Sequence, residues 1–289
     1  MKMVEINLHK EHLFLQTEDI DEESITCFIL TGRVNIINSN CVIIKSPEQI
    51  VIIDPGGLQS QAEYIEEIIG HYNYNNSPVY VLLTHCHIDH SYNLFRLFQQ
   101  KKIKFKTIMN QVCADIFAVV INRNVLLEDF LDFKIPSYIP DIILPDISEI
   151  SGSGLNVEID ICCSNNQLIY KKTSVLKEIE ISSYQLIVGD IVIECLSTPG
   201  HSPDSTCFRV ENVLITGDIL FAANMGIAGT IGWSLKDLKH SVWALFNYLL
   251  QEEFIDAIVS GHGPIINKTQ ALSIIEKKIS YLKILKILN

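Results

Sequence analysis

The stretch Thr84-His85-Cys86-His87-Ile88-Asp89-His90 is the most informative part of this chain, because it places three histidines and one aspartate within six residues. Imidazole and carboxylate groups are ligands for divalent metals. His85 and His87 are two positions apart, so their side chains point to the same side of an extended strand end. Asp89 and His90 follow where the chain must turn, and they can face a second metal. The stretch therefore predicts a metal site, against the alternative of a polar loop with coincidental histidines.

Three later segments also end at a potential ligand. His201 lies in a Ser-Thr-Pro-Gly-His-Ser segment, Asp218 follows an apolar run, and His262 follows another apolar run between two glycines. The run at 79–83 before the first motif is typical of a buried strand that delivers ligands at its carboxyl end. Five of the nine histidines fall in these motifs, so histidine is concentrated where a metal site needs it.

The order of these motifs resembles the metallo-β-lactamase superfamily of metallohydrolases. The resemblance covers about residues 25–265 and includes the acidic segment Val51-Ile52-Ile53-Asp54-Pro55-Gly56-Gly57. It implies an α/β fold of the αββα type, in which two β-sheets pack face to face with helices outside. The metals are then expected at one edge, where strand ends from both sheets meet.

The resemblance implies a role for each candidate residue. The ligands expected for the first metal are His85, His87 and His201. Those expected for the second metal are Asp89, His90 and His262. Asp218 matches the carboxylate that bridges both metals, and Asp54 matches a residue that orients the ligands from behind. Cys86 lies between two ligands, but neighbours in a strand face opposite sides, so it is not expected to touch a metal.

The expected chemistry is hydrolysis by a metal-bound hydroxide. Two metals roughly 3.5–4 Å apart can share a water and lower its pKa from about 16 towards 7. Asp89 and Asp218 are the candidates for passing a proton to the leaving group. Two zinc ions are expected, with iron and manganese as alternatives, because all three metals accept these ligands.

The substrate class is argued by exclusion. The net charge is −12 and the chain has only four arginines, which disfavours nucleic acids and heavily phosphorylated substrates. Within the resembled superfamily this leaves hydrolases of thioesters and lactones, similar to glyoxalase II, acyl-thioester hydrolases and lactonases, and it favours a small acyl substrate. Two alternatives stay open: a phosphodiesterase of the same fold, and a non-catalytic binding or regulatory member.

The sequence also predicts the location of the protein in the cell and the state of its cysteines. The first residues lack a basic region followed by an apolar one, and no apolar run reaches transmembrane length, so a cytoplasmic protein without membrane contact is expected. The eight cysteines form no CxxC pair and several lie in apolar runs, so buried thiols are expected.

The length and the hydrophobic content of 48% fit one domain over residues 1–289. Strands are expected at 26–31, 39–45, 49–53, 79–83, 185–188, 191–196, 205–210 and 213–216. Helices are expected at 61–72, 93–100, 235–250 and about 269–289, the first of these four with an apolar face and the third with Ser234 as its N-cap. The last helix carries an apolar stripe that packs on the domain or, alternatively, forms a homodimer contact.

Two segments are candidates for contacting substrate. Residues 111–145 are surplus to the expected fold: an apolar helix or helix pair broken near 122–124 is followed by a segment with three prolines in ten residues. This insert is either a cap over the active site or an extended connection packed on the scaffold. The glycine-rich loop 224–233 follows Asp218 and is expected to form part of a substrate wall, with Trp233 as an apolar contact.

Overall fold

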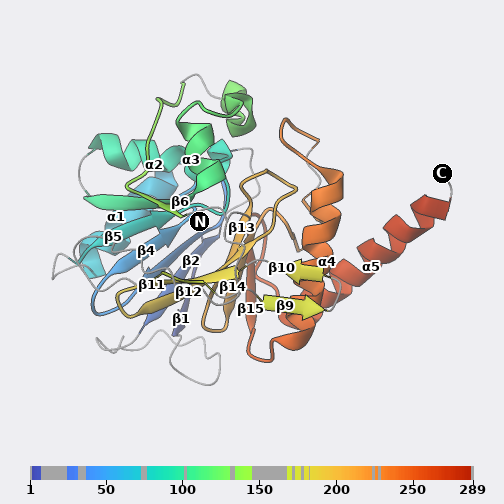
Figure 1. The fold of residues 1–289 in the computed structure, drawn as a ribbon. Coiled ribbons are helices and arrows are strands. Elements are labelled where there is room, and N and C mark those ends of the chain that lie inside the picture. The colour runs from blue at the N-terminus through green and yellow to red at the C-terminus, as the bar shows by residue number, and fades with distance from the viewer. Residues whose placement is uncertain are drawn as a thin grey trace.

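Two β-sheets lie face to face, and helices cover the outer side of each (Figure 1). The computed structural model describes residues 2–7, 25–31, 37–72, 77–100, 103–130, 134–144, 168–170, 173–176, 179–181, 183–222, 225–226 and 229–287. Within these residues the arrangement is the expected αββα sandwich, so the predicted fold class is confirmed.

The first sheet has seven strands, in the order β1 (Lys2–Asn7), β2 (Thr26–Thr31), β3 (Cys41–Lys45), β4 (Ile50–Ile53), β5 (Val79–Leu82), β6 (Phe105–Asn110) and β7 (Ile142–Leu144). The pairs from β1 to β4 are antiparallel, and the pairs from β4 to β7 are parallel. Helices α1 (Gln59–Tyr72) and α2 (Ile88–Gln100) connect the parallel strands, and α3 (Gln111–Phe117) follows β6. Parallel pairing makes the carboxyl ends of β4 and β5 neighbours at one edge of the sheet.

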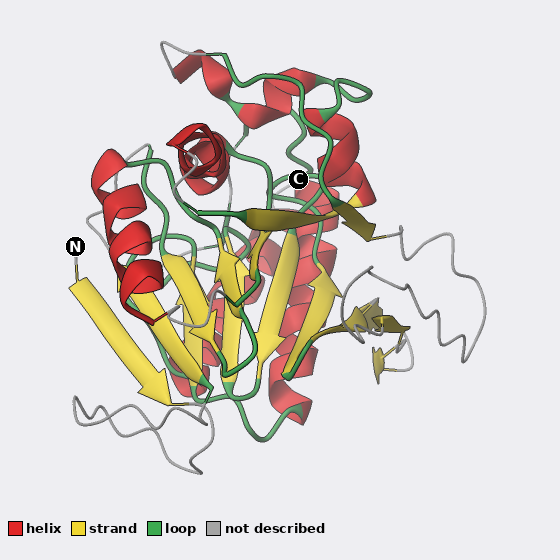
Figure 2. Ribbon diagram, turned by 90° about the vertical axis from the view of Figure 1, so that its left-hand side faces the viewer, coloured by secondary structure: helices red, strands yellow, loops and turns green. Residues whose placement is uncertain are grey.

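The second sheet has six strands, in the order β15 (Ala257–Ser260), β14 (Val213–Gly217), β13 (Thr206–Val210), β12 (Ile191–Ser197), β11 (Ser183–Val188) and β8 (Leu168–Tyr170). All its pairs are antiparallel except β14 with β15, which α4 (Leu235–Gln251) connects. Helix α5 (Lys268–Ile287) follows β15, and β9 (Thr173–Leu176) pairs with β10 (Ile179–Ile181) in a separate ribbon. Figure 2 shows strands of the sandwich with helices beside them.

The two-residue period of the strands explains the layers. Ile29 and Ile53 point into the core between the sheets, whereas their neighbours Phe28 and Ile52 point outward to the core under α1, α2 and α3. The second sheet alternates in the same way, with its outward side chains packed against α4 and α5. Because both faces are covered, the central strands are almost continuously apolar, which is why their sequences lack clear alternation.

The helix after the first motif begins earlier than predicted. The expected start was 93, but α2 begins at Ile88, so Asp89 and His90 lie in its first turn. The carbonyl of His87 accepts hydrogen bonds from the backbone N–H groups of His90 and Ser91. A carboxylate is stabilised at a helix N-terminus, which suits Asp89 to this position. The turn expected after His87 is therefore the helix start itself.

The insert is only partly helical, and part of it belongs to the first sheet. Helix α3 ends at Phe117, and two 3₁₀ turns follow, η1 (Arg123–Leu126) and η2 (Glu128–Phe130). The left-handed backbone of Val119 explains the break, because a β-branched residue in this conformation does not continue a helix. The residues after the second proline form β7, which pairs with β6.

Buried side chains anchor the insert to the scaffold under α2; these are Cys113, Ala114, Ile116, Phe117, Val125, Leu126 and Ile135. Val119, Val120 and Ile139 are exposed. The described parts of the insert therefore include a firmly packed connection, and its role as a cap stays a prediction.

Helix α4 begins where predicted, and the Ser234 hydroxyl accepts a hydrogen bond from the backbone N–H of Asp237. Trp233 is partly buried against the core under α4, and its contact with substrate stays a prediction. Ile275 anchors α5 to this core, whereas the rest of the predicted apolar stripe lies outside the described side chains. None of the described helices is long and apolar enough to cross a membrane. The described cysteines are buried free thiols: Cys27, Cys41, Cys86, Cys113, Cys195 and Cys207.

Candidate metal centre

All the predicted ligands meet at one edge of the sandwich, in two neighbouring groups. The three-histidine group consists of His85, His87 and His201. The four-residue group consists of Asp89, His90, Asp218 and His262. Within each group the potential ligand atoms lie within 4.8 Å of one another. Each group draws ligands from both halves of the fold, because the ligands at 85–90 follow β5 and the others follow β12, β14 and β15.

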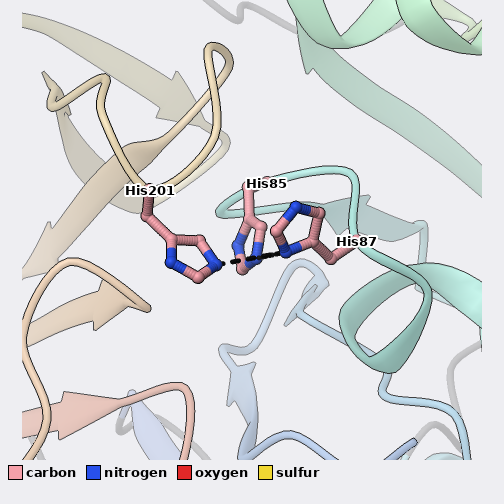
Figure 3. A group of neighbouring side chains, drawn as sticks. All are labelled: His85, His87 and His201. Atoms are coloured by element: carbon pink, nitrogen blue, oxygen red, sulfur yellow. Dashed lines mark hydrogen bonds between the residues drawn. The ribbon is translucent and has the colours of Figure 1, made fainter. Parts of the chain in front are cut away.

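The three-histidine group is formed by converging ring nitrogens (Figure 3). Nδ1 of His87 lies 3.0 Å from Nε2 of His85 and 3.1 Å from Nε2 of His201. His85 and His87 reach the group from the loop after β5, and His201 reaches it from the loop between β12 and β13. All three side chains are buried.

Hydrogen bonds behind the rings determine which nitrogen faces the group. The carbonyl of Gly226 lies 3.1 Å from Nδ1 of His201 and can only accept, so that nitrogen carries the proton. Nδ1 of His85 lies 3.1 Å from the Thr84 hydroxyl, whose own proton goes to Asp54. In both rings the lone pair is therefore on Nε2, which points into the group.

Burial keeps the imidazoles of His85 and His87 neutral. It lowers the pKa of His87 to about 3, with His201 adding to the effect, and it lowers the pKa of His85 well below the usual value of 6.5, with His90 and His87 adding to it. A proton on Nδ1 of His87 can satisfy only one of the two Nε2 lone pairs that face it, so at least one lone pair stays without a donor. Such a set of donors fits a divalent metal.

The four-residue group contains two carboxylates and two histidines. His262 Nε2 lies 3.0 Å from Asp89 Oδ2 and 3.4 Å from Asp218 Oδ2. His90 Nε2 lies 3.3 Å from Asp218 Oδ1 and 3.6 Å from Asp89 Oδ2. Asp218 Oδ2 is also 3.4 Å from Nε2 of His201, so Asp218 touches both groups.

The charges in this group oppose the effect of burial. Burial alone would lower the pKa of His262, but hydrogen bonds to Asp218 and Asp89 raise it to about 9. Burial also acts to lower the pKa of His90, but Asp54, Asp89 and Asp218 outweigh it and hold that pKa well above 6.5. Burial would raise the pKa of Asp218, yet His90 and His262 hold it well below its usual value. Without metal, the group is therefore a cluster of charged pairs.

Asp54 makes hydrogen bonds to the first motif from behind. Its carboxylate accepts hydrogen bonds from the backbone N–H of Thr84 at 2.7 Å and from the Thr84 hydroxyl at 2.6 Å. The same carboxylate lies 2.8 Å from Nδ1 of His90, which turns Nε2 of that ring towards the four-residue group. Asp54 is buried and has a left-handed backbone with φ 53°, a conformation that aspartate tolerates better than most residues.

Two further observations fit a metal in the four-residue group. Nε2 of His90 and Oδ1 of Asp218 are buried and lie 3.3 Å apart, but neither atom makes a hydrogen bond of good geometry. A Cβ atom at Gly261 would lie 2.0 Å from Asp218 Oδ1 and 2.6 Å from His90 Cε1, so only glycine leaves the space beside these ligands free. The residues of both groups thus fit divalent metals.

Cys86 stays outside both groups. Its sulfur lies 3.9 Å from the Ser202 hydroxyl, and the side chain is fully buried. Burial raises the pKa of the thiol well above its usual value, so it does not supply a thiolate ligand.

Several residues that shape the site carry no recognisable motif in the sequence. Thr84 is adjacent to the first motif and could have been noticed there, because it links Asp54 to His85. Phe221 lies beside His262, with 5.8 Å between the ring centroids. Asn40 and Asn110 hydrogen-bond to the loops that carry His262 and His201, and only the structure reveals these contacts.

The sequence is similar to a protein-family model and to known proteins. A family model described as the Metallo-beta-lactamase superfamily matches residues 34–156. The "Probable metallo-hydrolase YqgX" of Bacillus subtilis (strain 168) is 26% identical over 231 residues, which cover 79% of this chain and 86% of that protein. The "Probable polyketide biosynthesis zinc-dependent hydrolase BaeB" of Bacillus velezensis is 30% identical over 90 residues, which cover 26% of this chain and 40% of that protein.

Solved structures show the same fold. The BLEG-1 B3 metallo-beta-lactamase is similar with a TM-score of 0.56 at 21% identity, over 85% of this chain and 96% of that one. TTHA1623 in a di-iron-bound form is similar with a TM-score of 0.50 at 18% identity, over 83% of this chain and 96% of that one. With its two-sheet sandwich and two groups of histidine and aspartate residues at the edge, the chain is similar to members of the metallo-β-lactamase superfamily.

Proposed function

We propose that this chain is a dinuclear metal-dependent hydrolase that cleaves a thioester or a lactone. The observation that carries the proposal is the position of Asp218, whose carboxylate oxygens lie within 3.4 Å of histidines from both ligand groups. A carboxylate in this place is suited to serve two metals at once. When bound, two divalent ions supply Lewis acidity and lower the pKa of a water from about 16 to near 7.

The side chains of the two groups and Asp54 have different proposed roles. His85, His87 and His201 offer ring nitrogens and no carboxylate, so they leave the full charge of a bound ion available. Asp89 is 13% exposed at its side chain, so it is the ligand-group carboxylate with most access to a leaving group and our candidate for proton transfer. Asp54 holds His90 in one ring orientation.

Zinc is the metal that we propose. The similar BaeB protein carries "zinc-dependent" in its name, and imidazole with carboxylate is a ligand set that zinc accepts. The similar fold of TTHA1623 holds two irons, so iron, like manganese, is the alternative.

The proposed substrate is a small acyl compound. The net charge of −12 disfavours polyanions, which supports a thioester or lactone over a nucleic acid. Exposed apolar side chains on the insert, Val120 and Ile139, offer surface for an acyl group. The similarity to a hydrolase of polyketide biosynthesis is in line with an acyl substrate.

A substrate panel tests the reaction class. Metal-replete protein would be assayed with chromogenic thioesters, lactones and phosphodiesters, before and after strong chelation. We expect turnover of a thioester or lactone that chelation abolishes. Much faster turnover of phosphodiesters would replace this proposal with a phosphodiesterase, and no turnover of any class would favour the non-catalytic alternative.

Elemental analysis of the metal-replete protein tests the dinuclear claim separately. We expect the metal content to approach two ions per chain, because the two ligand groups are both complete. A saturating value of one ion per chain, with His90 and His262 intact, would contradict the dinuclear proposal.

A further inference from the structure

The centre is assembled from two halves of the chain, and its geometry depends on how the loops of the second sheet are held against the first. His201 lies in the loop between β12 and β13, and His262 lies in the loop after β15. Each loop receives hydrogen bonds from one asparagine of the first half.

Asn40 holds the loop of His262. It is buried, with 4% of its surface exposed, and it directly precedes β3. Its Nδ2 donates to the carbonyl of Ser260 at 2.8 Å and to the carbonyl of Gly263 at 2.9 Å. Its backbone N–H donates to the carbonyl of Gly261 at 2.6 Å. These carbonyls lie on both sides of His262, so one residue fixes the backbone from which that ligand projects.

Asn110 holds the loop of His201. It ends β6 and caps α3, because its Oδ1 accepts a hydrogen bond from the backbone N–H of Cys113 at 2.8 Å. Its Nδ2 donates to the carbonyl of Asp204 at 2.7 Å and to the hydroxyl of Thr206 at 3.0 Å. The amide therefore fastens the chain shortly after His201 to the first sheet.

We propose that Asn40 and Asn110 are positioning residues, each dedicated to one ligand group: Asn40 to the four-residue group through His262, and Asn110 to the three-histidine group through His201. This inference rests on the metal-binding part of the proposed function. Residues that orient ligands from behind change metal affinity by about 10- to 100-fold when altered. The separation of the two loops predicts that each asparagine affects its own group alone.

Serine is the matched substitution. Asn40→Ser and Asn110→Ser remove the two amide donors, and serine still caps a helix at position 110. Asn40→Asp and Asn110→Asp form a second pair, which keeps the side-chain shape and also loses the donors. Asn247 is the control, because its buried amide donates to the carbonyl of Trp243 within α4.

The test is a zinc titration of the full chain in zinc-buffered solutions, followed by NMR of the histidine ring nitrogens. In Asn40→Ser, the rings of His90 and His262 should need at least about 10-fold more free zinc than in the wild type, while those of His85 and His201 respond as before. Asn110→Ser should show the reverse, and Asn247→Ser should change neither group.

Each outcome is decisive. Variants in which both groups weaken together, or in which neither weakens, would overturn the inference while zinc binding by the wild type upholds the metal centre. If the serine variants do not fold, the aspartate variants give the same reading. A wild-type chain whose rings ignore zinc would overturn the metal centre and this inference together.

Discussion

The two ligand groups are neighbours, yet they differ in charge and in access. The three-histidine group is buried, and burial keeps its His85 and His87 neutral. The four-residue group holds two carboxylates, and its His262 and Asp89 side chains are 15% and 13% exposed. In the metal-free protein His90 and His262 are protonated at neutral pH and paired with carboxylates.

Because of this difference, the number of protons that a metal must displace on binding differs between the two groups. The three-histidine group presents lone pairs that are already free, so binding there releases no protons from His85 or His87 at neutral pH. Binding in the four-residue group must displace protons from two histidines. We therefore expect the first group to bind metal more tightly, and the second group to bind more tightly as the pH rises towards 9.

Replacing Asp218 tests the link between the groups and should have the largest effect. Asp218→Ala removes a carboxylate that touches histidines of both groups, so metal should be lost from both. We expect kcat/KM to fall by more than about 100-fold, the upper range for residues that only support ligands. Asp256→Ala is the control, since that exposed side chain bonds Asn212 at the other end of β15. Near-normal turnover of Asp218→Ala would mean that another carboxylate serves both groups.

Substitutions of the two glycines beside His262 should have different effects, one on metal binding by the four-residue group and the other on stability. Gly261→Ala would bring a methyl group within 2.0 Å of Asp218 Oδ1, so metal affinity of the four-residue group should fall by at least about 10-fold. Gly263 has φ +89° with open space around its Cβ position, so Gly263→Ala should lower stability by about 1 kcal/mol and leave metal binding intact. Zinc titration and thermal unfolding of both variants measure the two effects. Equal zinc affinity in the two variants would contradict the crowding argument.

The stability of the metal-free protein should depend on pH, because the histidine pKa values are lowered in one group and raised in the other. The depressed pKa values of His85 and His87 cost stability as the pH falls below 6.5 towards 3, because the unfolded chain binds those protons first. The raised pKa values of His90 and His262 stabilise the fold below 6.5, and this stabilisation is lost as the pH rises through about 9.

The Tm of the metal-free protein should therefore peak near pH 6.5 and fall on both sides by several degrees. Thermal unfolding monitored by circular dichroism from pH 4 to pH 10 would measure this. His262→Gln should reduce the fall of Tm at alkaline pH and leave the fall of Tm at acid pH unchanged. A Tm that keeps rising between pH 7 and pH 9 would contradict the charged state assigned to the four-residue group.

The smallest effect is expected at the insert. Val120→Ser removes exposed apolar surface, and each lost methylene contact costs about 0.8 kcal/mol, so KM for a long-chain thioester should rise a few-fold. KM for an acetyl thioester should change less. Val192→Ser is the matched control, because Val192 is an exposed valine on β12. The same change for both chain lengths would argue for a structural role of the insert.

The sequence predicted the ligands better than it predicted what holds them. Asp218 and His262 were found because each follows an apolar run, and His201 because it lies in a Ser-Thr-Pro-Gly-His-Ser segment. The strands that precede all three end at one edge of the sandwich. The start of α2 at Ile88 was missed because metal ligands occupy its first turn, where the pattern of apolar residues is interrupted.

The supporting contacts leave no local pattern. Asn40 bonds a carbonyl 220 positions away, and any residue can offer that carbonyl. Strand β7 was missed for a similar reason, since three residues after two prolines do not show a strand period, and only pairing with β6 makes them a strand. Such features depend on tertiary contacts between distant segments, which spacing within one segment does not encode.

The division of each ligand group between two halves of the chain has a consequence for synthesis on the ribosome. The ligands up to His90 are made 172 residues before His262, which at about 5–20 residues per second is a delay of roughly 10–30 s. His201 completes the three-histidine group 111 residues after His90, and His262 completes the four-residue group only 61 residues later, so the two groups become complete at different times. We expect zinc capture by the three-histidine group to begin once His201 has emerged, and capture by the four-residue group only when the residues after β15 have emerged. Zinc bound to ribosome-stalled chains of increasing length would measure both points.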